Sequence, residues 1–368
     1  MAKNFRVMLK TTGAKCNLAC QYCFYLNKES LYPSGTFKIS DELLEEYTKQ
    51  YMESQSTPEV SFDWQGGEPS LLGIDFYRKA VKSQKKYAKV AQKGVNSFQT
   101  NGLLLDAEWC KFFKENNFLV GLSLDGPQEL HDKYRFDKGK NPTHSGVESA
   151  LKLLQDYGVD YNILCCVSNS NVEYPLEVYS YFRSMGVEKI QFIPVVNKSQ
   201  IPGEVTPESI TGKQYGDFLI SVFDEWYRRD VGSIFIFLFE HFAARLVGRH
   251  PGLCVFETTC GLELALEHTG DLYSCDHYVS PDYLLGNIFT TNIADLVYTK
   301  QQYDFALEKA ELPTKCLECD VRFICNGGCP KNRITLHNNE ENKLNYLCEG
   351  YYSFFNHSKE PLRKLLNV

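Results

Sequence analysis

The chain has 368 residues, of which 43% are hydrophobic and 23% are charged. This composition is typical of a folded globular protein and argues against extensive disorder, and the length suggests either two domains or one large domain with an appendage. Its net charge of −7 at pH 7 is opposite in sign to that of a typical nucleic-acid-binding domain, so we expect no nucleic-acid partner.

The most apolar run, Ile234 to Phe239, is far shorter than the ~20 residues that span a bilayer. The first residues lack the apolar core of a signal peptide, so we expect a cytoplasmic protein without a membrane partner. In that reducing compartment the 14 cysteines favour metal binding over disulfides. Eleven of them form patterned groups, whereas we expect the other three, Cys110, Cys165 and Cys166, to be core residues.

The first predicted strand, Phe5 to Lys10, leads directly into Cys16, Cys20 and Cys23, spaced C-x3-C-x2-C. Three thiolates on one loop can hold three corners of a cubane iron–sulfur cluster and leave the fourth iron without a protein ligand. The residues alone also allow a zinc knuckle, a disulfide with a spare thiol, or three buried thiols that pack as small apolar groups.

Strands and helices then alternate along the chain. Ser40 is a candidate N-cap for a helix in which Leu43, Leu44, Tyr47 and Tyr51 recur at helical spacing. The further predicted strands are 60–64, 95–99, 119–124, 161–167 and 189–194, and the further helices are 74–87, 107–116, 147–157 and 176–185. Six strands that alternate with helices predict an α/β fold with a parallel sheet, either doubly wound or closed toward a barrel.

Polar residues follow several of these strands, where sites of βα barrels lie. Gln65-Gly66-Gly67-Glu68-Pro69 follows the second strand, and its glycines allow close backbone approach while its carboxylate can accept hydrogen bonds. Ser123 ends the fourth strand, with Asp125 and Arg135 after it. A tight turn, an Asx-type cap and a solvated surface charge are the structural alternatives for these residues.

An amphipathic stretch at 218–227 precedes the last third of the chain, which contains eight more cysteines. We predict a domain boundary near residue 235, with domains at 1–234 and 235–368. The spacing is Cys260-x9-Gly270-x4-Cys275, then Cys316-x2-Cys319-x5-Cys325-x3-Cys329, then Cys348, with Cys254 as an additional candidate ligand. Gly270 suits a hairpin turn. Eight thiolates divide into two sets of four, which suit either two iron–sulfur clusters or two zinc sites.

The first triplet resembles the signature of the radical S-adenosylmethionine (SAM) superfamily, and the last eight cysteines resemble its SPASM extension. The resemblance implies a partial (β/α)6 barrel, three 4Fe–4S clusters, and SAM bound at the open iron and cleaved to a 5′-deoxyadenosyl radical. It implies one auxiliary cluster on Cys254, Cys260, Cys275 and Cys329, and a second on Cys316, Cys319, Cys325 and Cys348. The implied SAM-binding residues are Tyr22, Gly66, Gly67, Glu68, Ser123, Arg135 and Val196.

The strongest resemblance is to the anaerobic sulfatase-maturating enzymes, carried by segments 16–25, 65–69, 99–102, 118–127, 161–167 and 273–278. It implies oxidation of a cysteine or serine of an unfolded or nascent sulfatase to Cα-formylglycine. Asp276 is then the base, Tyr25 and Gln65 hold the peptide, and His277 has a supporting or structural role. The implied electron donor is a flavodoxin or ferredoxin, and we expect a monomer.

Two alternatives remain open at this point. One is a SPASM-type maturase that forms thioether or carbon–carbon crosslinks in a small peptide, although many of these carry an additional precursor-binding domain. The other, from a different class, is a multi-cluster electron carrier or a zinc-binding module, neither of which needs a SAM pocket.

Overall fold

A computed structural model of the chain describes residues 4–33, 35–201, 203–250, 252–334 and 344–368. The strands are β1 Arg6–Lys10, β2 Glu59–Gln65, β3 Lys93–Thr100, β4 Leu119–Ser123, β5 Asp160–Val167, β6 Lys189–Pro194, β7 Phe235–Ile236, β8 Glu263–Glu267, β9 Asp271–Tyr273 and β10 Leu284–Asn287. The helices are α1 Asp41–Ser54, α2 Ile74–Tyr87, α3 Ala107–Glu115, α4 Gln128–His131, α5 His144–Asp156, α6 Pro175–Ser184, α7 Gly212–Arg229, α8 Phe237–Leu246, α9 Ile293–Val297, α10 Lys300–Glu308, α11 Thr314–Leu317, α12 Arg322–Cys325 and α13 Cys348–Leu366.

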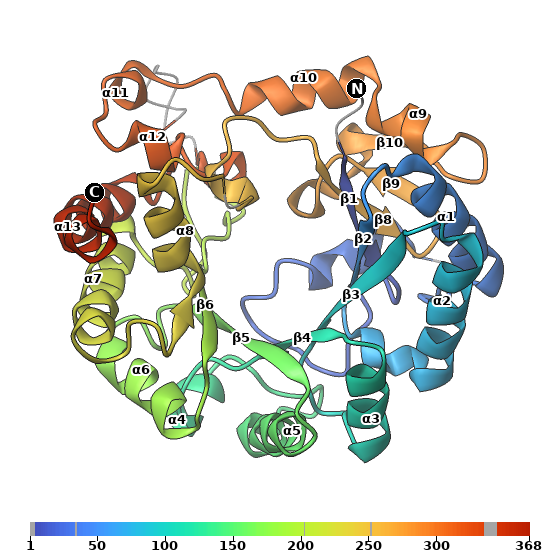
Figure 1. Cartoon of the computed structure of the whole chain (residues 1–368), viewed down its shortest axis with the longest axis horizontal. Coiled ribbons are helices and arrows are strands. Elements are labelled where there is room, and N and C mark those ends of the chain that lie inside the picture. The colour runs from blue at the N-terminus through green and yellow to red at the C-terminus, as the bar shows by residue number, and fades with distance from the viewer. Residues whose placement is uncertain (1–3, 34, 202, 251, 335–343) are drawn as a thin grey trace.

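Strands β1 to β7 lie side by side in chain order and are parallel. They form a curved arc with the connecting helices on its outer side (Figure 1). The six predicted strands and their helices are therefore present, and the prediction of a partial (β/α)6 barrel is confirmed. Its carboxyl-terminal strand ends meet at one rim, where the loops that carry the cysteine triplet and the glycine pair begin.

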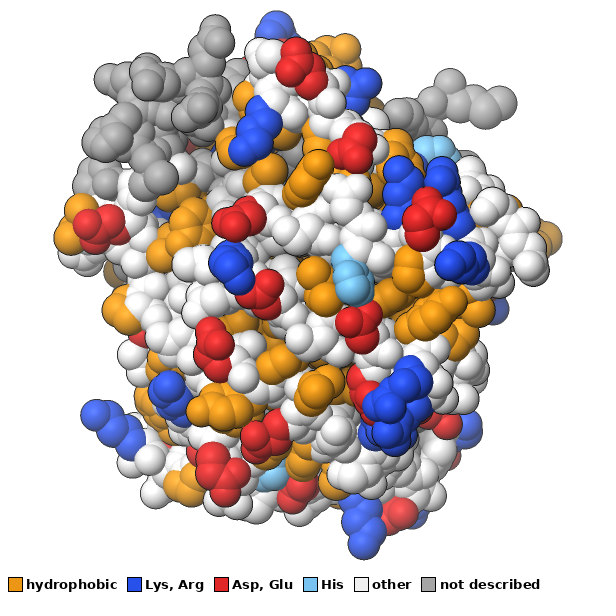
Figure 2. All heavy atoms as spheres, turned by 90° about the vertical axis from the view of Figure 1, so that its left-hand side faces the viewer, with side chains coloured by type: hydrophobic (Ala, Val, Ile, Leu, Met, Phe, Trp, Pro, Cys, Tyr) orange, Lys and Arg blue, Asp and Glu red, His pale blue; other side chains and the backbone are white. Residues whose placement is uncertain are grey.

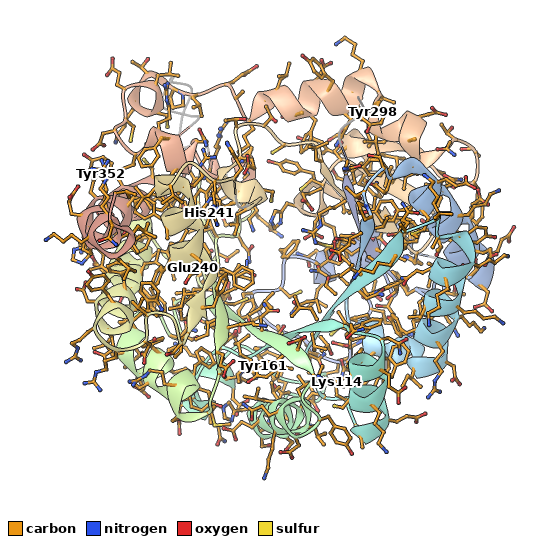
Figure 3. The ribbon with its side chains drawn as sticks, in the orientation of Figure 1. Lys114, Tyr161, Glu240, His241, Tyr298 and Tyr352 are labelled. Atoms are coloured by element: carbon orange, nitrogen blue, oxygen red, sulfur yellow. The ribbon has the colours of Figure 1, made fainter. Side chains whose placement is uncertain are left out.

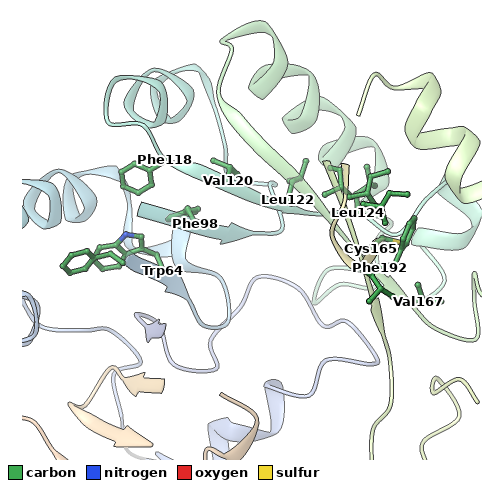
Figure 4. Packing of buried hydrophobic residues seen from close by; sticks show 14 of the residues in the cluster. Trp64, Phe98, Phe118, Val120, Leu122, Leu124, Cys165, Val167 and Phe192 are labelled. Atoms are coloured by element: carbon green, nitrogen blue, oxygen red, sulfur yellow. The ribbon is translucent and has the colours of Figure 1, made fainter. Parts of the chain in front are cut away.

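Buried apolar side chains fill the layer between the strands and the outer helices. Trp64, Phe98, Val120 and Leu122 from three successive strands lie side by side in this layer (Figure 4) and are fully buried. Alternate residues of a strand face opposite sides, so the intervening side chains point into the barrel. The predicted cap of α1 is also confirmed, since the Ser40 hydroxyl accepts a hydrogen bond of 3.0 Å from the Leu43 amide.

This alternation corrects one prediction about the unpatterned cysteines. Cys110 and Cys165 are buried, as expected, but Cys166 is only partly buried and lines the central cavity. Cys165 and Cys166 are neighbours on β5 and therefore face opposite sides of the sheet. The assignment of Cys166 to the core was wrong for this reason.

The C-terminal region joins the same sheet. Strand β7 pairs with β6 at one edge, and β8 pairs in parallel with β1 at the other. Strands β8 and β9 form an antiparallel hairpin whose turn contains Gly270 at φ +92°, as its spacing predicted. The sheet thus continues across residues 234 and 235, and the domain boundary stays a prediction.

Helix α13 packs closely against α7 and lies next to α8 (Figure 1). Three glycines form the contact, because a Cβ on Gly350 would lie 2.0 Å from the carbonyl oxygen of Gly212, and one on Gly216 would lie 2.7 Å from the Cα of Gly350. Cys348 is the first residue of α13, so this helix contact determines where Cys348 lies.

On the face formed by α6, α7 and α13, acidic and basic side chains are interspersed with apolar ones (Figure 2). Among the residues that the structure describes, no helix combines the length and the apolarity that a membrane crossing requires.

Candidate active site

A cavity of about 1060 Å³ occupies the inside of the barrel, and both regions of the chain line it. All three cysteines of the first triplet lie on its wall, as do Cys254, Cys260, Cys275 and Cys329 from the C-terminal region. The triplet and the first C-terminal cysteine group thus face one cavity, which lies among the side chains inside the barrel (Figure 3). Chemistry in this cavity can use groups from both regions.

Backbone hydrogen bonds hold the triplet loop from two sides. On one side, the amides of Ala19 and Gln21 donate to the carbonyls of Phe136 and Tyr134, at 2.9 and 3.0 Å. On the other side, the amide of Gly67 donates to the Gly13 carbonyl at 2.7 Å. The loop geometry is therefore fixed by the chain itself, which preorganises the three thiols.

Gly66 and Gly67 let two backbone segments touch. A Cβ on Gly67 would lie 2.0 Å from the carbonyl oxygen of Lys15, and Gly66 has φ +134°, which side chains strongly disfavour. The sequence predicted that these glycines admit a ligand, and the structure shows that they also admit the cysteine loop. Any larger residue at position 67 would displace the segment that leads into Cys16.

Glu68 is buried with both carboxylate oxygens oriented by neighbours. One oxygen accepts from the Ser70 amide at 3.0 Å and the Thr100 hydroxyl at 2.8 Å, and the other accepts from the Asn101 amide at 2.8 Å. Burial raises the pKa of Glu68, and these donors oppose the rise. The carboxylate is thus rigidly held on the cavity wall, where a bound ammonium group would compensate its buried charge.

Tyr22, Asp125 and Arg135 form a buried polar cluster beside the triplet. The Tyr22 hydroxyl donates to Asp125 and accepts from the Arg135 guanidinium at 2.8 Å. The Nε of Arg135 is buried with no hydrogen-bond partner among the described residues. Arg135 is therefore no solvated surface charge, and its unmatched donor suits an anionic or polar ligand in the cavity.

The other predicted SAM contacts also lie on the cavity wall. Ser123 accepts a hydrogen bond of 3.0 Å from Gln99, and Val196 is buried. The neighbouring Asn197 donates to the Tyr22 carbonyl at 2.8 Å. This bond ties the segment after β6 to the cysteine loop.

Asp276 forms an ion pair with Lys10, a lysine that is only 2% exposed. Lys10 Nζ also donates to the Gln65 side chain at 3.3 Å. Burial alone would raise the pKa of Asp276, but the positive charges of Lys10 and, to a lesser degree, Lys331 lower it overall. Asp276 is thus an ionised carboxylate on the cavity wall, and Lys10 is a site residue that the sequence analysis missed.

The two remaining predicted residues next to Asp276 have different environments. Tyr25 lies on the cavity wall beneath Lys10 Nζ, which is 4.3 Å from its ring centroid, and its hydroxyl donates to the buried Glu267. Burial lowers the pKa of His277 to about 3, so its imidazole is neutral, and its ring packs 5.0 Å from that of Phe24.

The eight C-terminal cysteines gather into two groups. Their electrostatic neighbours are one another within each group: Cys254, Cys260, Cys275 and Cys329 in the first, and Cys316, Cys319, Cys325 and Cys348 in the second. In the first triplet, Cys16 and Cys20 likewise neighbour Cys23. The structure thus brings together the same three sets that the resemblance implied.

Burial raises the pKa of the Cys16 thiol to about 12 and that of the Cys20 and Cys260 thiols to about 11. Gathered, buried thiolates need a neighbouring positive charge, which the iron of a cluster provides. No three Cys, His, Asp or Glu side chains within the described ranges converge tightly enough to hold a single metal ion. The grouping of the cysteines fits iron–sulfur clusters. The polar cradle around the triplet, which consists of Glu68 and the cluster of Tyr22, Asp125 and Arg135, fits SAM.

The comparisons with known proteins agree with this geometry. The model of the radical SAM superfamily matches residues 11–182, and that of the SPASM iron–sulfur cluster-binding domain matches residues 259–320. A serine-type anaerobic sulfatase-maturating enzyme of Bacteroides thetaiotaomicron is 43% identical, over 97% of this chain and 90% of its own length. The chain belongs to the anaerobic sulfatase-maturating enzyme family.

Cysteine-type members are similar as well. One from Clostridium novyi is 34% identical over 96% of this chain and 95% of its own. The solved structure of native anSMEcpe with bound AdoMet and Cp18Cys peptide has a TM-score of 0.91 at 33% identity and covers 99% of both chains. The matches to a radical SAM model and to an iron–sulfur cluster-binding domain agree with the cofactors that the sequence predicted, and the crosslinking maturase, the electron carrier and the zinc module are not the family of this chain.

Proposed function

We propose that this protein oxidises a serine or cysteine side chain of a sulfatase polypeptide to Cα-formylglycine. One observation carries the proposal: Asp276, an ionised carboxylate, lies in the same cavity as the Cys16 triplet and directly follows Cys275 of a second cysteine group. A peptide side chain in this cavity can meet a hydrogen-atom acceptor, a base and an electron acceptor together. Neither an electron carrier nor a zinc module needs this combination.

The residues of the polar cradle would hold the cofactors. Cys16, Cys20 and Cys23 would ligate the first cluster, while Tyr22, Gly66, Gly67, Glu68, Ser123, Arg135 and Val196 would bind SAM. When bound, SAM and the clusters supply a 5′-deoxyadenosyl radical, which takes a hydrogen atom from the substrate Cβ, and an acceptor for one further electron. The unmatched Nε of Arg135 and the oriented carboxylate of Glu68 are the donor and the acceptor available for SAM.

Asp276 would act as the base. After the Cβ hydrogen atom has left, the hydroxyl or thiol proton moves to the Asp276 carboxylate, one electron leaves, and the carbon–oxygen or carbon–sulfur double bond forms. Lys10 keeps the carboxylate ionised and ready to accept that proton. For a cysteine target, water then replaces sulfur in the thioaldehyde, and hydrogen sulfide is released.

Gln65 and Tyr25 would position the peptide. Both lie on the cavity wall beside Lys10. The Gln65 side chain accepts a hydrogen bond from Lys10, and the Tyr25 hydroxyl donates one to Glu267, so both side chains are held in place. His277 has a supporting role, because its ring is neutral and packs against Phe24.

The two C-terminal groups would each hold a fully ligated cluster that transfers electrons, since four thiolates leave no open iron. The client would be an unfolded or nascent sulfatase, and a flavodoxin or ferredoxin would supply electrons. The monomeric state and the cytoplasmic location stay predictions.

The test is anaerobic incubation of the reconstituted protein with SAM, a reductant, and peptides that contain Cys-x-Pro-x-Arg or Ser-x-Pro-x-Arg. We expect 5′-deoxyadenosine together with a peptide aldehyde, detected by mass spectrometry and by hydrazine trapping. Cleavage of SAM without an aldehyde on either peptide would contradict the proposed substrate but not the radical chemistry.

A further inference from the structure

Lys309 is a completely buried lysine next to the first C-terminal cysteine group. It directly follows α10, is 0% exposed, and donates from Nζ to the carbonyl oxygens of Cys254 at 2.5 Å and Val255 at 3.1 Å. Its leading electrostatic partners are the sulfurs of Cys260, Cys254 and Cys329, ahead of the carboxylate of Glu257. The lysine thus faces three of the four cysteines of this group.

A buried ammonium group normally needs a counter-charge, because removal of a charge from water is costly. No carboxylate forms an ion pair with Lys309 in the part of the chain that the structure describes. Two backbone carbonyls offer dipoles but no net negative charge. Glu257 is a weaker electrostatic partner of Lys309, so most of the negative charge available to the ammonium group is that of the cysteine sulfurs.

A 4Fe–4S cluster with four thiolate ligands carries a net negative charge, which increases by one when the cluster is reduced. Net charge and hydrogen bonds near the sulfurs are among the factors that set the reduction potential. A fixed cation beside the thiolates stabilises the reduced form more than the oxidised form. It therefore raises the potential and makes the cluster a better electron acceptor.

We propose that Lys309 is the internal counter-ion of the cluster on Cys254, Cys260, Cys275 and Cys329, and that its charge lets this cluster accept the substrate electron. The proposal rests on the proposed function, in which the substrate carbon is oxidised. One electron leaves the substrate as its proton moves to Asp276, and the same electron reduces this cluster. Lys309 does not touch the substrate and is a positioning residue.

Other charged groups around these thiols differ in their exposure to solvent. Lys331 lines the cavity, and the partly exposed Arg333 donates to the Lys309 carbonyl at 2.6 Å. Lys309 lines the cavity as well, but it has no exposed surface, so water screens its charge less than it screens the charges of the partly exposed Lys331 and Arg333. Lys309 should therefore have the largest effect per charge on this cluster.

The experiment uses Lys309→Gln, which keeps an N–H donor for the two carbonyls and removes the charge. It is made in the background of Cys16→Ala, Cys20→Ala and Cys23→Ala, so that only the auxiliary clusters contribute to an EPR-monitored redox titration. We expect one of two auxiliary potentials to fall, with at least a tenfold change in the reduction equilibrium, or about 59 mV for one electron. The other potential and the iron content should not change.

Lys300→Gln is the matched control, because Lys300 is the first residue of α10, the helix that Lys309 directly follows, but it is 86% exposed and pairs with Asp304. It should change neither potential. Unchanged potentials in Lys309→Gln with full iron content would overturn the proposal. If Lys309→Gln loses iron, Lys309→Arg decides: retained iron supports a need for the charge, and lost iron shows that side-chain shape is what matters.

With the triplet intact, Lys309→Gln should form less formylglycine per 5′-deoxyadenosine than the unmodified protein, because the electron leaves the substrate less readily. If the unmodified protein forms no formylglycine at all, the proposed substrate fails. The potential measurement does not use a peptide, so it still tests the role of Lys309.

Discussion

The first cysteine triplet and the two C-terminal cysteine groups are assembled in different ways. The triplet lies within eight residues of one loop, and backbone hydrogen bonds to two flanking segments hold that loop in place. The C-terminal groups combine residues far apart in sequence, as in the set of Cys316 and Cys348. The geometry of the triplet is local, whereas that of the C-terminal groups depends on the packing of whole elements.

The side chains around the triplet also differ from those around the C-terminal cysteine groups. Next to the triplet, Arg135 has an unpaired donor and Glu68 has an oriented carboxylate, and both suit an exchangeable ligand. Next to the Cys254 group lies Lys309, whose donors are used by backbone carbonyls. The first environment suits binding and cleavage of SAM, and the second suits storage of an electron.

The strongest test of this division is removal of the triplet by Cys16→Ala, Cys20→Ala and Cys23→Ala. A cluster with three protein ligands that loses all of them cannot form, so 5′-deoxyadenosine formation should be abolished. The eight C-terminal cysteines should still hold about eight irons, from two 4Fe–4S clusters. Iron analysis and chromatography of SAM products measure both. Undiminished SAM cleavage would contradict the assignment of the triplet.

The next largest effect should come from Asp276→Asn, which keeps the shape and removes the base. Loss of general-base catalysis typically costs a factor of about 10² to 10⁴, so formylglycine should fall at least about a hundredfold while SAM cleavage continues. Asp271→Asn is a control that should leave formylglycine formation unchanged, because Asp271 is a carboxylate on β9 that accepts a hydrogen bond of 2.9 Å from Asn287 and does not line the cavity. Loss of auxiliary iron in Asp276→Asn would instead make Asp276 a structural residue.

Much of the site could be predicted from sequence where the signal is local. The triplet spacing, the Gly66-Gly67-Glu68 turn and the strand periodicity all act over a few residues, and the observed strands and hairpin agree with them. The sorting of eight cysteines into two groups followed from the family resemblance, since spacing alone allows other pairings.

The residues that sequence reasoning missed are single lysines. A lysine at the end of a strand, such as Lys10, is usually a solvated surface charge. Alternate residues of a strand face the same side, however, so Lys10 points into the barrel together with Arg6 and Met8. This alternation was the signal in the sequence that could have identified Lys10. Lys309 lies in the charged run Glu308-Lys309-Ala310-Glu311, where nothing distinguishes it from a surface residue. Its burial follows from contact with Cys254, far away in sequence, and only the fold reveals it.

A smaller effect should follow from Gly350→Ala, which tests whether the second C-terminal group depends on helix packing. The new methyl group would lie 2.0 Å from the Gly212 carbonyl oxygen, so α13 must move away from α7. Overpacking of this kind usually costs about 1–3 kcal/mol of stability. Because Cys348 begins α13, iron should also be lost, up to about four irons per chain.

Thermal unfolding and iron analysis of the anaerobically purified variant measure these two effects. Gly232→Ala is the control for added backbone strain without a steric clash: its new Cβ would meet nothing within 4 Å, while its φ of +81° adds local strain. It should lower the stability without loss of iron. If Gly350→Ala keeps both its stability and its iron, Cys348 is positioned by something other than the α7–α13 contact.

The smallest effect should come from Tyr22→Phe, which probes the environment of the triplet without removing a ligand. The ring stays in place, while the hydroxyl that joins Asp125 to Arg135 is lost. Asp125 keeps the Cys166 amide as a donor at 2.9 Å, so the cluster should loosen and not collapse. The variant loses two hydrogen bonds, and the one with Arg135 orients a proposed SAM-binding side chain. A net loss of about 1 kcal/mol for that bond predicts that SAM binds about fivefold more weakly. Equilibrium binding of SAM to the reconstituted protein measures this change. Tyr134→Phe is the control, because the Tyr134 hydroxyl contacts Asn169 and neither Asp125 nor Arg135, so its loss should leave the affinity for SAM unchanged. Equal weakening in both variants would mean that the aromatic cluster as a whole, and not the Tyr22 hydroxyl, keeps Arg135 in position for SAM.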